Sequence, residues 1–115
     1  MYMKADQKAN LSQKISSQKY GIVLIWSAYD EADLAVKDYD FNFTFIPKAF
    51  FNLNLTGNGV DVLLNRVDMN AMGTKYIYVS NNSITGYKTN ADDKKTINGF
   101  VLYNKYWVLR YVIGI

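Results

Sequence analysis

Two segments near the start of the chain carry the clearest patterns of apolar and polar residues. Residues 21–26 are uncharged and combine β-branched, leucine and tryptophan side chains, which favours a central strand buried on both faces. Residues 41–46 instead alternate, so that Phe41, Phe43 and Phe45 share one face while polar side chains share the other. This alternation predicts a strand with one dry face, formed by the three rings.

The rest of the chain also predicts short strands, separated by polar turns. Apolar or alternating runs indicate strands at residues 49–55, 60–67, 74–80, 83–87, 100–103 and 107–113. Leu11 and Ile15, four residues apart, fit either a first strand, which we favour, or the end of a helix. Residues 88–99 have Ala91 and Ile97 as their only apolar side chains and predict an exposed loop.

These patterns together predict an all-β fold. No window after residue 19 sustains an apolar period of 3.6 residues, so we expect no helix longer than two turns. About eight or nine mostly antiparallel strands joined by short turns are typical of a jelly-roll-like β-sandwich or of a barrel. A chain of 115 residues, half of them hydrophobic, has room for one core. We therefore expect a flexible polar stub at residues 1–10 and a single β-sandwich domain at residues 11–115.

Charge and hydropathy limit the kinds of molecule that this protein is expected to bind. The net charge of +3 lies in residues 1–19, which hold four lysines and one aspartate, while residues 20–115 carry nine basic and nine acidic residues. A neutral folded part argues against a phosphate-binding face. No run approaches 18 apolar residues, and the polar start lacks the apolar centre of a signal peptide, so we expect no membrane span.

Several kinds of catalytic chemistry lack their usual residues. The chain has neither histidine nor cysteine, which excludes the usual zinc sites and the serine and cysteine triads. The glycines at 57 and 59 lack the third glycine and the following helix of a phosphate loop, and a turn is the better interpretation. Asp38 and Asp40 flank Tyr39 and remain a possible carboxylate pair. We nevertheless expect no enzyme activity, no cofactor and no metal, with calcium in the acidic loop 30–40 as the alternative to a solvated loop.

The ten tyrosines offer a binding chemistry instead. Trp26 and Trp107 lie within strong apolar runs, which favours packing in the core. Several tyrosines sit at expected strand ends beside Asp, Asn or Lys, namely Tyr29, Tyr39, Tyr87 and Tyr106. Aromatic faces next to amides and carboxylates are what a saccharide site needs.

Five segments in order carry a resemblance to a known family. They are GIVLIWS at 21–27, FTFIPK at 43–48, GTKYIYV at 73–79, ITG at 84–86 and WVLRYVIG at 107–114. Over residues 11–115 the chain resembles the C-terminal β-sandwich domain of tail and baseplate proteins, of receptor-binding or tail-fibre type, from siphophages and prophages of Gram-positive bacteria. Relatives often carry histidines where residues 38–43 and 87–90 stand here, so a role of those histidines does not transfer.

The resemblance implies a location and a set of partners. It implies a domain in the virion tail, at the baseplate or fibre tip, that attaches to the host or joins baseplate proteins, often as a homotrimer. It also suggests that Met1 begins either a fragment of a longer protein or a short prophage reading frame.

From this we expect a non-catalytic module that binds a host cell-wall saccharide where loops 30–40 and 86–97 meet. The candidate ligand-binding residues are Asp38, Tyr39, Asp40, Tyr87 and Asn90. Two alternatives stay open: a structural or trimerising tip domain without its own ligand, and a nucleic-acid-binding β-barrel, which a basic isoelectric point near 9.0 suggests.

Overall fold

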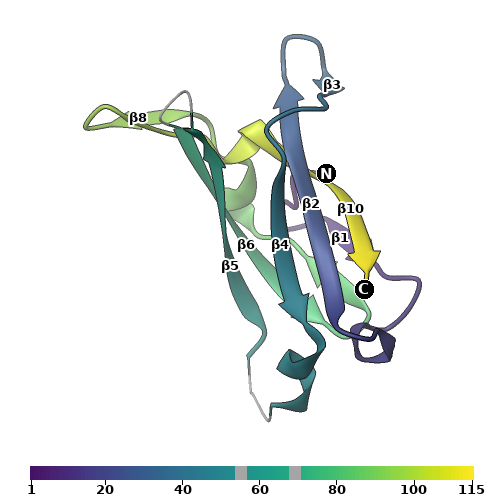
Figure 1. Ribbon diagram of the computed structural model, residues 1–115. Helices are drawn as coiled ribbons and strands as arrows, with labels where there is room; N and C mark the ends of the chain where they lie inside the picture. Colours follow the sequence, from purple (N-terminus) through teal and green to yellow (C-terminus); the bar gives the residue numbers. More distant parts are fainter. Residues whose placement is uncertain (54–56, 68–70) are drawn as a thin grey trace.

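Alternating apolar and polar residues build two curled sheets that face each other (Figure 1). The structure is a computed structural model that describes residues 1–53, 57–67 and 71–115. Within these residues it contains ten strands and short 3-10 turns as its only helical elements. The prediction of an all-β sandwich without long helices is confirmed for the described part of the chain. None of its helical turns is long and apolar enough to cross a membrane.

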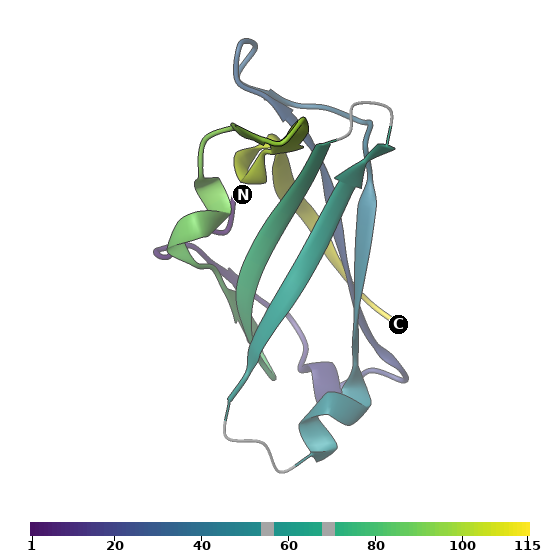
Figure 2. The same cartoon turned by 90° about the vertical axis from the view of Figure 1, so that its left-hand side faces the viewer.

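The first sheet is built around β6 (Ala71–Ser80). β6 pairs with β5 (Gly59–Arg66), β7 (Ser83–Thr85) and β9 (Phe100–Leu102), while β1 (Lys8–Asn10) extends the sheet beyond β7 and β8 (Lys95–Ile97) extends it beyond β9. The pairing of β6 with β9 is parallel and the others are antiparallel. Figure 2 shows this sheet from its outer side.

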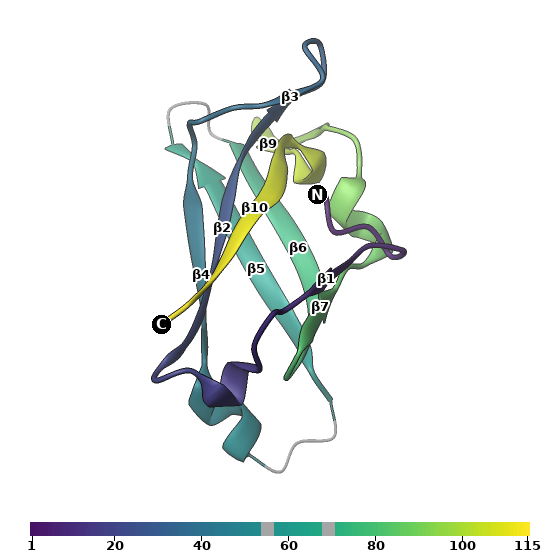
Figure 3. The same cartoon turned by 90° about the vertical axis from the view of Figure 1, so that its right-hand side faces the viewer.

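The second sheet is built around β2 (Gly21–Asp30), the uncharged segment that the sequence places at the centre of a sheet. Its antiparallel partners are β10 (Trp107–Gly114), β4 (Asn42–Pro47) and the short β3 (Ala35–Val36). β2, β4 and β10 lie side by side on the opposite side of the molecule, which Figure 3 shows. The predicted central position of β2 is thus confirmed, although Val23 and Ile25 on its outer face are only half-buried.

The core lies between the sheets and is centred on two tryptophans. Trp26 and Trp107 are fully buried, as their apolar surroundings predict. Trp107 packs directly on Gly73 of β6, where a Cβ atom would lie 2.7 Å from the indole ring. A larger residue at 73 would force these two strands apart. The other buried apolar residues of the cluster are Met3, Ile15, Ile22, Leu24, Ile46, Val62, Leu64, Ile77, Val79, Ile84 and Leu109.

Strand β4 presents the opposite face from the one predicted. Its pairing with β2 places Thr44 opposite the core residue Leu24. The Thr44 hydroxyl accepts a hydrogen bond from the indole N–H of Trp26 at 3.0 Å, which gives the polar face of β4 a partner inside the sandwich. The ring-bearing face therefore points to solvent, and its three rings are exposed: Phe41, Phe43 and Phe45.

The first ten residues, expected as a flexible stub, are packed against both sheets. β1 pairs with β7, and Met3 is fully buried in the core. The carbonyl of Met3 accepts a hydrogen bond from the backbone N–H of Tyr87 at 2.9 Å. Gly86 makes this close approach possible, because a Cβ atom there would overlap the Met3 carbonyl.

Two predicted strands are 3-10 turns in the structure. Around Leu11 and Ile15 the chain forms η1 (Ile15–Ser17), and the first strand lies earlier, at β1. After Pro47 it forms η2 (Lys48–Asn52) instead of a strand over 49–55, of which residues 54–56 lie outside the described residues. The turn brings the successive rings of Phe50 and Phe51 into edge-to-face contact at 5.2 Å, which a strand would place on opposite faces.

The expected loop at 88–99 contains ordered elements. It begins with η4 (Lys88–Ala91) and continues into a hairpin of β8 and β9 that projects from the sandwich (Figure 1). Asn98 and Gly99 both have positive φ, 51° and 81°, as a two-residue hairpin turn requires. The Asn-Gly pair was a signal for this hairpin in the sequence.

Candidate functional site

A cleft of about 350 Å³ lies at the end of the sandwich where β2 runs into the acidic loop. It is lined by four tyrosines together with charged residues, and the lining is Tyr29, Asp30, Glu31, Ala32, Tyr39, Arg66, Tyr103 and Tyr106. These residues come from the end of β2, the loop after it, the segment between β3 and β4, the last residue of β5, and the turn η5 (Asn104–Tyr106) together with Tyr103 before it. Segments far apart in the sequence therefore meet at this end, which is uppermost in Figure 1.

One wall of the cleft is held by Asp40. Its carboxylate accepts a hydrogen bond from the Tyr106 hydroxyl at 2.6 Å and forms an ion pair with the Arg66 guanidinium at 3.2 Å. Arg66 also donates to the Tyr106 hydroxyl at 2.9 Å. The backbone carbonyl of Asp40 accepts the indole N–H of Trp107 at 3.1 Å, which ties the left-handed Asp40 (φ 56°) to the core. Burial, and then the bond to Asp40, raises the pKa of Tyr106, so its hydroxyl remains a donor at neutral pH.

The opposite wall is held by Glu31. Its carboxylate accepts a hydrogen bond from the Tyr103 hydroxyl at 2.7 Å and pairs with the ammonium of Lys105 at 3.0 Å. Lys105 also pairs with Asp93, so this lysine bridges the acidic loop to the segment before β8. Burial, and then Glu31, raises the pKa of Tyr103 to about 12. The Tyr103 and Lys105 hydrogen bonds lower the pKa of Glu31.

The structure separates the predicted ligand residues instead of gathering them. Tyr39 lines the cleft and is half-exposed, and Asp40 holds the lining residues Arg66 and Tyr106 without lining the cleft itself. Asp38 turns away to Arg110 of β10, at 3.0 Å. Tyr87 belongs to a different hollow. Loops 30–40 and 86–97 are linked through Lys105, which lies outside both and pairs with Glu31 and Asp93.

Asn90 is fully buried and its side chain is used within the fold. Its amide oxygen accepts from the backbone N–H of Tyr76 at 2.7 Å, and its NH₂ group donates to the carbonyls of Met3 and Tyr76 at 2.7 and 2.9 Å. Its own carbonyl accepts the ammonium of Lys75 at 2.6 Å. Asn90 therefore joins the N-terminal segment, β6 and η4.

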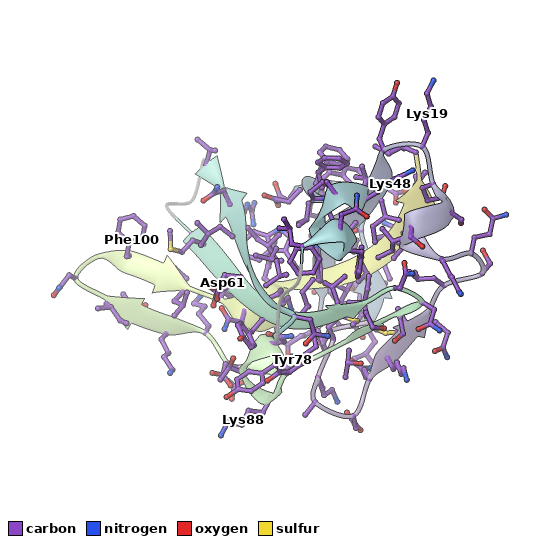
Figure 4. The ribbon with its side chains drawn as sticks, turned by 90° about the horizontal axis from the view of Figure 1, so that it is seen from below. Lys19, Lys48, Asp61, Tyr78, Lys88 and Phe100 are labelled. Atoms are coloured by element: carbon purple, nitrogen blue, oxygen red, sulfur yellow. The ribbon has the colours of Figure 1, made fainter. Side chains whose placement is uncertain are left out.

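The second hollow, of about 450 Å³, lies on the outer side of β6. Three tyrosines meet there edge to face, with ring centroids 5.3 to 6.3 Å apart: Tyr76, Tyr78 and Tyr87. Asp61 of β5 lines the same hollow, and Figure 4 labels it together with Tyr78. This hollow lacks the arginine of the first cleft among its lining residues.

Several carboxylates of the acidic loop pair with cationic side chains. Asp33 pairs with Lys37 at 2.7 Å, while Asp38 and Asp40 pair with arginines on different strands, Arg110 and Arg66. Asp38 and Asp40, the possible carboxylate pair, are therefore held by different strands. Within the described ranges, no three His, Cys, Asp or Glu residues come close enough to hold a metal ion.

Among the residues that shape the cleft, Glu31, Arg66 and Tyr103 were not singled out from the sequence. Each is brought there by a contact between distant segments, such as the bond between Tyr103 and Glu31, which are 72 residues apart. Tyr103 had one local signal, because it stands three residues before Tyr106, just ahead of the last strand. The chain has two arginines, and Arg66 at the end of a strand was a second signal.

Comparison with known proteins finds no relative of this chain. No family model, no curated protein and no solved structure matches the chain.

Proposed function

We propose that this domain is a non-catalytic saccharide-binding module and that the cleft between Tyr39 and Tyr103 is its binding site. The observation that carries the proposal is the combination of four tyrosines with an arginine and carboxylates in one open cleft. A sugar ring has apolar C–H faces, which pack on aromatic rings, and hydroxyls, which pair with charged side chains.

The wall residues are already fixed before any ligand arrives. The Tyr106 hydroxyl is held by Asp40 and Arg66, and the Tyr103 hydroxyl by Glu31. Binding then costs little ordering of these side chains, while the half-exposed Tyr39 is placed to cover a bound ring. The cleft is shallow and polar, which limits intrinsic affinity to the millimolar to micromolar range, roughly 4 to 8 kcal/mol.

The resemblance to phage tail domains suggests the biological setting. In that setting the ligand is a saccharide of a Gram-positive cell wall, and the domain sits at the tip of a virion tail beside other baseplate proteins. Many copies on one particle would make weak sites effective, because the first contact raises the local concentration for the next.

Binding of a multivalent form of the domain to cell-wall preparations from a panel of Gram-positive bacteria tests the proposal. Tyr39→Ala should reduce binding at least tenfold, whereas Tyr20→Ala, which removes a similarly exposed ring outside the cleft, should leave it unchanged. Arg66→Lys should also weaken binding, because a lysine lacks the planar fork that pairs with two oxygens.

Two outcomes contradict the proposal. If Tyr87→Ala abolishes wall binding and Tyr39→Ala does not, the site is the hollow beside Tyr76 and Tyr78. If the unmodified multivalent domain binds no wall preparation and no polysaccharide extracted from one, the saccharide module is refuted, and a structural tip domain takes its place.

A further inference from the structure

The outer face of the second sheet is apolar across all three of its long strands. β4 and β10 flank β2 in a register that gives two cross-strand rows: Phe43, Ile25 and Tyr111 in one, and Phe45, Val23 and Ile113 in the other. Residues directly opposite each other in a sheet lie on the same face. These six residues are called the outer apolar face below.

The outer apolar face is open to solvent in the single chain. Phe43, Phe45 and Tyr111 are 69%, 51% and 57% exposed. At roughly 200 Å² for an aromatic side chain, these three rings alone present about 350 Å². Phe41 and Ile115 continue the same alternation at the ends of the rows and are also exposed. With Ile113 added, the surface presents about 600 Å² at the same rough area per side chain, the lower end of the roughly 600 to 1,000 Å² that each partner contributes to a stable interface.

A charged side chain reaches this face at one end, where the guanidinium of Arg110 lies over the ring of Tyr111, 5.5 Å from its centroid. The segments 21–29, 42–47 and 111–115 contain no Asp, Glu, Lys or Arg. Arg110 lies at the bulge between Leu109 and Tyr111, but its guanidinium donates to Ser27 at 2.9 Å and pairs with Asp38. That ion pair closes one end of the face and gives it a polar edge.

We infer that a second copy of this chain covers the outer apolar face. A neutral apolar surface is complementary to itself, and faces of this kind distinguish interfaces between identical chains from the more polar interfaces between different proteins. A different partner would gain orientation and rate from opposite charges, and the one charge at this face, Arg110, is already paired with Asp38. The surface area is also in the range that a stable pair needs. This inference is independent of the saccharide site, which lies at the end of the sandwich.

The test is the mass of the full chain in solution, measured by light scattering from about 1 to 100 μM. The unmodified chain should have the mass of two or three copies, against 13.2 kDa for one. Phe43→Glu should return it to one copy, because a carboxylate would be buried between the two faces without a partner. Leu63→Glu is the matched control, since Leu63 on β5 is 67% exposed on the other sheet, and it should keep the mass unchanged.

A second variant at the opposite edge, Tyr111→Glu, should have the same effect as Phe43→Glu, with circular dichroism showing that both remain folded. A monomer at all concentrations for the unmodified chain would overturn the inference, and so would an oligomer that survives both substitutions. A mass of three copies that Phe43→Glu abolishes would also fit the homotrimer that the family resemblance implies, with the apolar faces gathered around a threefold axis.

Discussion

At the scale of single residues, Lys75 is the most unusual feature of the chain. Its side chain points into the core and is 1% exposed. The ammonium donates to two neutral carbonyls, those of Asn90 at 2.6 Å and Tyr2 at 3.2 Å, and lies near the rings of Tyr2 and Trp26. Burial lowers the pKa of Lys75 from 10.5 to about 7. The folded chain therefore holds this proton far less tightly than the unfolded chain does.

This difference predicts that stability rises with pH. Between pH 7 and 10.5 the unfolded state keeps the proton on Lys75 while the folded state loses it, so the free energy of unfolding increases by up to about 1.4 kcal/mol per pH unit. Urea unfolding at intervals from pH 7 to 9.5 should show this slope. The pKa of the Met1 ammonium is also lowered, chiefly by burial, and adds a smaller slope of the same sign.

Lys75→Met separates the contribution of Lys75 to this pH slope from that of the Met1 ammonium. The substitution removes the titrating group of Lys75 but keeps most of its apolar volume. The variant should lose most of the slope and gain stability relative to the unmodified chain at pH 7. An unmodified chain whose unfolding free energy is flat from pH 7 to 9.5 would show that Lys75 is not buried in this way.

At the scale of elements, local pattern predicts where the long strands lie, and contacts between strands decide the rest. The uncharged run of β2 and the alternation of β6 are visible in the sequence, because their own side chains determine which face is buried. The alternation of β4 is equally visible, but the pattern alone does not say which of its faces meets the core. The Trp26–Thr44 bond and the register with β2 decide that question, and both depend on a second strand.

Thr44→Val tests how far that bond orients β4. The substitution keeps the shape of the side chain but leaves the buried indole N–H of Trp26 without its acceptor, which should cost roughly 1 to 3 kcal/mol of unfolding free energy. Thr96→Val, on the exposed strand β8, should change it by less than about 0.5 kcal/mol. Urea midpoints followed by tryptophan fluorescence report both variants, and equal midpoints would mean that the hydrogen bond does not orient the strand.

At the scale of the whole molecule, the candidate site also shows that local sequence patterns do not predict contacts between distant segments. Tyr29, Tyr39 and Tyr106 could be singled out from the sequence because aromatic residues stood beside polar ones at strand ends, and all three line the cleft. Glu31 and Arg66, which hold the hydroxyls of Tyr103 and Tyr106, were not singled out, because their roles depend on contacts with segments far away in the sequence. The cleft exists only because β5, η5 and the acidic loop end at the same end of the sandwich.

The N-terminal segment shows how strongly distant contacts can override composition. Residues 1–10 are polar enough to predict a flexible stub, yet they join the two sheets. The Met1 carbonyl accepts the backbone N–H of Leu109 at 2.7 Å, and the Gln7 carbonyl accepts that of Gly86 at 3.0 Å. Met3 fills a place in the core, and the Tyr2 carbonyl solvates Lys75.

Deletion of residues 1–10 should therefore destabilise the whole domain. The loss combines the burial of one methionine, roughly 2 to 3 kcal/mol, with the pairing of β1 to β7 and one of the two acceptors of Lys75. A small domain is stable by only about 5 to 15 kcal/mol, so the truncated chain should unfold at a clearly lower urea concentration or fail to fold.

Met3→Ala isolates the core contribution and should cost roughly 2 to 4 kcal/mol, whereas Lys4→Ala, next to it and exposed, should be nearly neutral. The fluorescence of the buried Trp26 and Trp107 reports unfolding in each case. A truncated chain with the same midpoint as the full chain would show that the first ten residues are indeed a dispensable stub.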